Sequence, residues 1–148
     1  MFNETHIHPM FVHFPIALGM FGYLIFCITV FFKQHSDCFK FFSFLIMLFA
    51  TIAAICTAIT GSYFTFHLTG EPNTIENIHS NLAGVTVTLF SIGSVAQLYS
   101  KIFKKDFLYY KWAVFAIYTA AFIAVMITGY YGGSIVYDYL INKSLVGQ

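Results

Sequence analysis

Histidine is the residue type in this sequence best suited to hold a cofactor, and the chain has six histidines in 148 residues. Neutral imidazole nitrogens bind haem iron, zinc and copper. His13 stands out because it lies in an apolar run, beside Val12 and Phe14, where ionisable groups are costly and tend to mark function. Histidines at a membrane boundary are also common amphipathic anchors, so both interpretations stay open for each of them. The other histidines at or beside the ends of apolar runs are His6, His8, His67 and His79.

The composition places these histidines in a membrane protein. Hydrophobic residues make up 59% of the chain and charged residues only 9%, whereas soluble domains average about 25% charged residues. Such a chain cannot cover a water-facing surface. A net charge of +1 and the absence of arginine argue against a nucleic-acid partner.

The elements that must position the histidines are four apolar runs, each long enough to cross about 30 Å of hydrocarbon as a helix. Short loops between the runs predict antiparallel neighbours. We therefore expect an all-α, four-helix membrane bundle that forms one domain over residues 1–148. The expected spans are about 9–32, 39–63, 78–99 and 108–131.

Lysine placement predicts the orientation of this bundle. The first loop carries Lys33 and Lys40, and the third loop region carries Lys101, Lys104, Lys105 and Lys111. The middle loop, expected over 65–77, has no lysine and holds Glu71 and Glu76. The positive-inside rule places lysine-rich loops in the cytoplasm. In a bacterial inner membrane both termini and the middle loop would then be periplasmic, as would most of the histidines.

The start of the first span is ambiguous because Pro9 and Pro15 each lack a backbone N–H group. The helix either starts at Pro9 and kinks near Pro15, or starts at Pro15 after a short interfacial turn. His8 and His13 are five residues apart and would not share one face of a regular helix.

Short similarities between the two halves predict an internal repeat. The segment from His13 to Ala17 is similar to that from His79 to Ala83, and Ile59-Thr60-Gly61 matches Ile127-Thr128-Gly129 at a slightly larger offset, a difference that a loop can absorb. Two helical hairpins of the same orientation would be related by a pseudo-twofold axis along the membrane normal. His13 and His79 would then face each other. Gly61 and Gly129 would admit a neighbouring helix or a flat ligand, although tight packing and helix termination explain these glycines equally well.

Two histidines facing each other across a bundle suit axial ligation of haem b, and the lack of a C-x-x-C-H motif excludes covalent attachment of the c type. The hypothesis for cofactor binding therefore names His13, His79, Gly61 and Gly129. The same chemistry permits a zinc or copper site built from His8, His13, His67 and His79. A structural accessory subunit of a larger membrane complex is a third interpretation. No Ser-His-Asp arrangement or nucleotide motif is evident, which favours a redox carrier or binding subunit over a stand-alone enzyme.

The segment from His8 to Leu18, HPMFVHFPIAL, resembles the opening motif of a bacterial family of four-span membrane proteins, domain of unknown function 2231. Two looser matches follow, at His79, Asn81 and Ala83 and at Gly132, Gly133, Val136 and Tyr137. The chain departs from the family after Tyr137, where a glycine-rich tail is usual. Some members are fused to Rieske or cytochrome c modules, so the resemblance implies redox partners such as a quinone, a cytochrome c or a Rieske protein. A homodimer or larger complex is also compatible with it.

Overall fold

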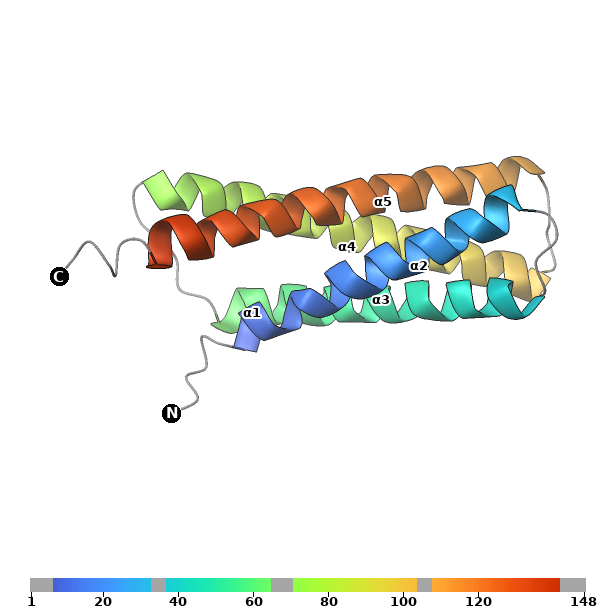
Figure 1. Cartoon of the computed structure of the whole chain (residues 1–148), viewed down its shortest axis with the longest axis horizontal. Coiled ribbons are helices and arrows are strands. Elements are labelled where there is room, and N and C mark those ends of the chain that lie inside the picture. The colour runs from blue at the N-terminus through green and yellow to red at the C-terminus, as the bar shows by residue number, and fades with distance from the viewer. Residues whose placement is uncertain (1–6, 33–36, 65–70, 104–107, 142–148) are drawn as a thin grey trace.

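The computed structural model describes residues 7–32, 37–64, 71–103 and 108–141, and these are almost entirely helical (Figure 1). Four helices within these ranges are long and apolar enough to cross a membrane, which confirms the predicted all-α membrane bundle. The elements in chain order are α1 (Ile7–Phe11), α2 (His13–Phe31), α3 (Asp37–Phe64), α4 (Glu71–Phe103), α5 (Leu108–Ser134) and a terminal π-helix, η2 (Ile135–Ile141).

The helices alternate in direction, so the bundle has two chemically different ends (Figure 1). We call the end that carries His8 and His79 the histidine end; α1 begins there, and α5 and η2 end there. The opposite end carries Lys40, Lys101 and Lys111, and we call it the lysine end. Among the described residues, these histidines and these lysines thus lie at opposite ends of the bundle, as the charge pattern predicts.

The first span begins earlier than either alternative considered from the sequence. It starts with α1 at Ile7 and continues as α2 from His13, with Val12 as a turn residue between them. The backbone of Val12 keeps helical dihedral angles, φ −62° and ψ −25°, and its N–H donates to the His8 carbonyl oxygen at 3.1 Å. The interruption precedes Pro15, which cannot donate an N–H to the carbonyl four residues earlier. The first span is therefore a nearly continuous helix whose hydrogen-bond ladder is interrupted by Pro15.

The expected middle loop over 65–77 is too long, because α4 begins at Glu71. Pro72 is compatible with this start, since the first turn of a helix has no intrahelical partner for its N–H groups. The polar residues that follow Pro72 belong to the first turns of a helix and not to a loop.

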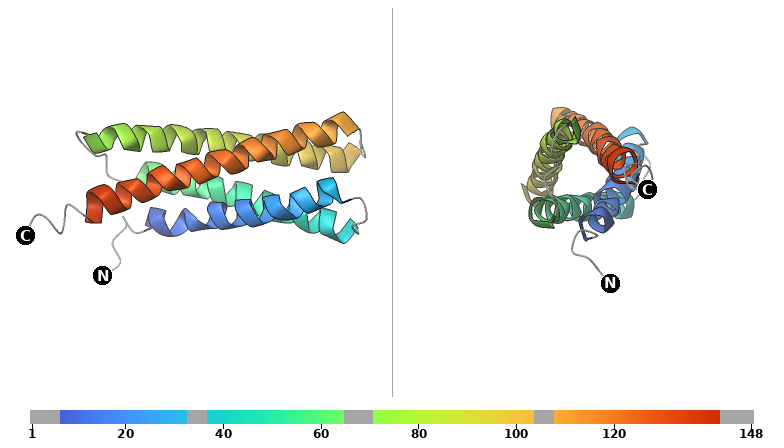
Figure 2. Two further views of the ribbon diagram at one scale, coloured as in Figure 1. Left: turned by 45° about the horizontal axis from the view of Figure 1, so that its top comes forward. Right: turned by 90° about the vertical axis from the view of Figure 1, so that its left-hand side faces the viewer.

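The two hairpins, α2 with α3 and α4 with α5, are packed alike and are related by a constant shift in sequence. In α2, a Cβ added to Gly22 would lie 2.7 Å from the sulfur of Met47. In α4, a Cβ on Gly93 would lie 2.6 Å from Cε1 of Tyr118. The difference in residue number between Gly22 and Gly93 equals that between Met47 and Tyr118. We call this constant difference in residue number the repeat shift. The internal repeat is therefore visible in the packing, and Figure 2 shows the four long helices arranged around a common centre.

Phe26, Met47, Phe90 and Tyr118 form the centre of the bundle. A buried polar chain crosses this core, in which the Thr51 hydroxyl contacts the Ser94 hydroxyl at 2.7 Å and Tyr118 donates to Gln97 Oε1 at 3.1 Å. Interhelical hydrogen bonds of this kind hold membrane helices together where no hydrophobic force between them exists. Large apolar side chains cover the outside instead, as expected for a lipid-facing surface. Examples are Phe21, Leu24, Phe49, Ile52, Val95 and Ile123.

The lysine end is stabilised by its cations. Lys111 Nζ donates to the carbonyl oxygen of Val30 at 2.8 Å, which places a positive charge at the C-terminus of α2. Lys101 Nζ lies 5.0 Å from the centre of the Phe44 ring, within cation–π distance. These contacts tie neighbouring helices together where the hydrocarbon region ends.

Candidate functional site

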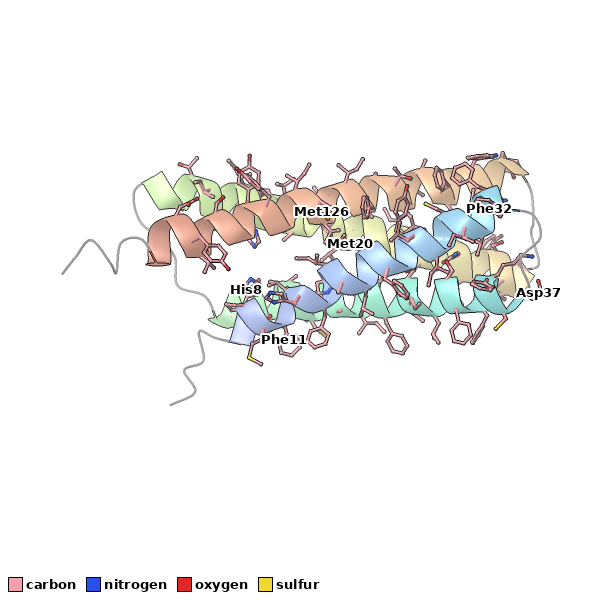
Figure 3. The ribbon with its side chains drawn as sticks, in the orientation of Figure 1. His8, Phe11, Met20, Phe32, Asp37 and Met126 are labelled. Carbon is pink, nitrogen blue, oxygen red and sulfur yellow. The ribbon has the colours of Figure 1, made fainter. Side chains whose placement is uncertain are left out.

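His8 on α1 and His79 on α4 bring two imidazole rings together at the histidine end. Their ring centroids are 6.4 Å apart and their planes are inclined by 80°. One ring comes from each hairpin, and both side chains are partly buried. Figure 3 labels His8 at this end of the bundle, with Phe32 and Asp37 marking the other.

Backbone carbonyl oxygens determine which nitrogen of each ring carries a proton. His8 Nδ1 lies 3.1 Å from the carbonyl oxygen of Thr57, and His79 Nδ1 lies 3.0 Å from that of Thr128. Because a carbonyl oxygen can only accept, each Nδ1 must carry the proton. The lone pair of each ring is then on Nε2, as an imidazole ligand to a metal requires.

A glycine stands beside each ring. A Cβ on Gly61 would come within 2.9 Å of Cε1 of His8, and a Cβ on Gly132 within 3.0 Å of Cε1 of His79. Carbon atoms pack at about 3.5–4.0 Å, so neither position has room for a larger residue while its imidazole stays in place. Glycine therefore lets each ring lie directly on the opposing helix of its own hairpin.

Every part of this site is duplicated by the same repeat shift that relates Gly22 to Gly93. The shift relates His8 to His79, Thr57 to Thr128, and Gly61 to Gly132. The predicted equivalences of His13 with His79 and of Gly61 with Gly129 are therefore wrong. A single uninterrupted shift replaces the two unequal offsets expected from the sequence.

His13 does not face His79. Its ring is exposed, and its Nδ1 lies 2.8 Å from the carbonyl oxygen of Pro9, one turn earlier in the chain. The sequence placed His13 in the span correctly, but its ring turns back onto the carbonyl of its own helix. Gly129 has a different neighbour as well, since a Cβ there would lie 3.2 Å from Cδ1 of Ile16.

The remaining candidates lie elsewhere. His6 and His67 fall outside the described residues. Asp138 is exposed on η2, and the Nδ1 atoms of His8 and His79 lie against carbonyl oxygens.

The pair of rings has the spacing of two ligands on one metal ion. With metal–nitrogen distances of about 2.0–2.1 Å, two imidazoles on opposite sides of one ion would have centroids about 6.3 Å apart. The steep angle between the planes does not disturb this arrangement, because each ring can rotate about its own metal–nitrogen bond. Over the described parts of the chain, no group of three or more His, Cys, Asp or Glu side chains gathers to hold a metal ion.

Three participants in the site were not recognised from the sequence. Thr57 and Thr128 are ordinary residues in apolar helices, and they contribute main-chain atoms that leave no mark on residue type. Gly132 enters the sequence analysis only as part of a looser family match. The signal that finds all three is the ungapped comparison of the chain with itself at the repeat shift, which pairs identical residues at His8, Gly22, Phe44, Ala50 and Thr57.

Comparison with known proteins agrees with this architecture. A family model described as a predicted membrane protein, DUF2231, matches residues 4–144. No curated protein and no solved structure matches the chain. The match covers both hairpins together with His8 and His79. The chain therefore belongs to the DUF2231 family of multi-pass membrane proteins.

Proposed function

We propose that this protein is a membrane electron-transfer subunit that binds one haem b between His8 and His79. The observation that carries the proposal is the pair of neighbouring imidazoles, whose ring centroids are 6.4 Å apart and whose Nδ1 atoms each donate to a carbonyl. Haem bound there would supply one-electron chemistry. The chain itself would supply two imidazole nitrogens, from His8 and His79, and their orientation.

The neighbourhood supports the two histidines as ligands. Gly61 and Gly132 leave room for the imidazoles to lie against α3 and α5. The Thr86 and Thr128 hydroxyls, 3.2 Å apart, add polar groups beside His79. With the orientation expected from the lysines, the site would open towards the periplasm. Partners there would be a quinone at the membrane surface, or a cytochrome c or Rieske protein.

The second candidate is a single zinc or copper ion on the same two nitrogens. Two opposed imidazoles can hold copper, whereas zinc prefers four ligands and would need two more from outside the pair. His67 could be one of these, although it lies outside the described residues. A structural subunit that binds neither haem nor metal is the third candidate.

One preparation separates the three. The full chain would be purified in mild detergent from cells supplied with haem, and its reduced-minus-oxidised visible spectrum recorded beside its zinc and copper content. Haem binding predicts Soret and α bands in the wild type that are lost in His8→Ala and in His79→Ala. A colourless protein with one equivalent of zinc or copper would overturn haem in favour of the metal site. A colourless protein without metal would overturn both.

His13→Ala is the matched control, because His13 lies close to His8 in sequence but directs its ring elsewhere. The proposal expects this variant to keep the haem bands of the wild type. Loss of the bands in His13→Ala, with retention in His8→Ala, would show that the assignment of ligands is wrong.

A further inference from the structure

The first span contains a carbonyl group that its own helix cannot satisfy. Pro15 stands four residues after Phe11, the position from which an α-helix normally donates an N–H to the Phe11 carbonyl. Proline has no N–H to give. In a membrane span such a freed carbonyl is costly unless a neighbouring side chain or helix satisfies it.

Thr57 on α3 meets this need. Its hydroxyl donates to the Phe11 carbonyl oxygen at 3.1 Å. The backbone carbonyl of the same residue accepts from His8 Nδ1 at 3.1 Å. One residue of α3 therefore holds both the end of α1 and the imidazole that α1 carries.

The second hairpin shows the arrangement at the equivalent position without a proline. The repeat shift takes Pro15 to Thr86, which has an N–H, and Phe11 to Leu82. Thr86 donates its own hydroxyl to the Leu82 carbonyl at 2.8 Å, and the Thr128 hydroxyl lies 3.2 Å from the Thr86 hydroxyl. The backbone carbonyl of Thr128 thus accepts from His79, as that of Thr57 accepts from His8. The hydroxyl of Thr128, unlike that of Thr57, does not bind a carbonyl that a proline has left without a donor.

We propose that Thr57 is the positioning residue of His8, and that it acts by replacing the hydrogen bond that Pro15 removes. The proposal rests on the proposed function for its purpose, which is to hold one of the two proposed ligands, His8, on α1. It also makes the two halves of the site unequal. The His8 side depends on a contact between hairpin helices that the His79 side does not need.

The coupling between Thr57 and Pro15 gives the test. In the full chain, labelled with ¹⁵N-histidine and reconstituted without haem, NMR would follow the exchange of the Nδ1–H proton of His8 with water, with signals assigned from His8→Gln and His79→Gln. Thr57→Val removes only the hydroxyl and should speed exchange at His8 by about fivefold to tenfold, the effect of one lost hydrogen bond. Thr57→Ser keeps the hydroxyl and should retain the wild-type rate.

Pro15→Ala restores an N–H donor for Phe11, so the Thr57 hydroxyl becomes redundant. In the Pro15→Ala background, Thr57→Val should change exchange at His8 by less than roughly twofold. The matched control is Thr128→Val, whose effect on His79 should be the same with and without Pro15→Ala. An equal effect of Thr57→Val in both backgrounds, or no effect in either, would overturn the proposal.

The test still gives a result if the Thr57→Val variant does not fold. If Thr57→Val alone fails to fold, recovery of folded protein on adding Pro15→Ala supports the coupling, and failure to recover overturns it. Because the NMR measurement uses protein without haem, it is separate from the proposed function. A wild-type chain that takes up no haem would remove the electron-transfer proposal and leave the result for Thr57 standing.

Discussion

Gly61 and Gly132 provide the sharpest test of the site by mutation, because each touches an imidazole. In Gly61→Ala the new methyl group would start 2.9 Å from Cε1 of His8. Normal carbon packing at about 3.5–4.0 Å requires the ring to withdraw by at least about 0.5 Å. The hydrogen bond from Nδ1 to Thr57 is already 3.1 Å long, and the same withdrawal would bring it near the limit of about 3.5 Å for such a bond.

The expected loss of haem affinity follows from the known contribution of hydrogen bonds that orient ligating histidines. Loss of a hydrogen bond that orients a ligating histidine typically lowers affinity by about 10- to 100-fold, equivalent to about 1.4–2.7 kcal/mol. We expect this loss of haem affinity in Gly61→Ala and, from a starting distance of 3.0 Å to His79, a similar or smaller loss in Gly132→Ala.

Gly133→Ala is the matched control, since it is the next residue of α5 and a Cβ there meets nothing within 4 Å. Gly84→Ala on α4 is equally unobstructed. Both should bind haem like the wild type, and the helices should gain up to about 0.5–1 kcal/mol from the change to alanine. Spectrophotometric titration of the haem-depleted protein gives the affinities. Equal affinities for Gly61→Ala and Gly133→Ala would refute the reasoning about the site.

Two further predictions concern the bundle itself. Gly93→Ala should destabilise the protein by about 1–3 kcal/mol, because its methyl group would overlap the buried ring of Tyr118, and Gly22→Ala should cost a similar amount, because its methyl group would meet Cγ2 of the β-branched Ile46 at 2.9 Å as well as the sulfur of Met47; an unchanged stability of either variant in detergent unfolding would contradict this. Lys111→Met should cost about 0.3–1 kcal/mol, because Val30 loses a charged donor at the end of its helix, and an unchanged unfolding midpoint would contradict that role.

The fold was accessible from the sequence because its determinants are long and repeated. Four apolar runs fix four helices, and the lysines separate one end from the other. The helix boundaries were less accessible. Glu71 and Pro72 are polar or helix-breaking by type, yet they suit the first turn of a helix whose interior begins several residues later.

The site was only partly accessible because its geometry depends on main-chain atoms. Five residues of helix place His8 and His13 on different faces, and residue type could not decide which of the two faces the other hairpin. Depth in the apolar run favoured His13, whereas the structure leaves His13 on Pro9 and His8 on Thr57. The acceptors are backbone carbonyls, which every residue possesses, so only the repeat shift between the two hairpins could have indicated them.

The most direct measurement is the electron paramagnetic resonance spectrum of the oxidised, haem-loaded full chain. Two axial imidazoles give low-spin iron, and loss of either one leaves high-spin iron or no haem. We predict a low-spin signal for the wild type and for His13→Ala, and its loss in both His8→Ala and His79→Ala. A high-spin wild type, or a low-spin signal that survives in His8→Ala or His79→Ala, would contradict the claim that these two histidines share one iron.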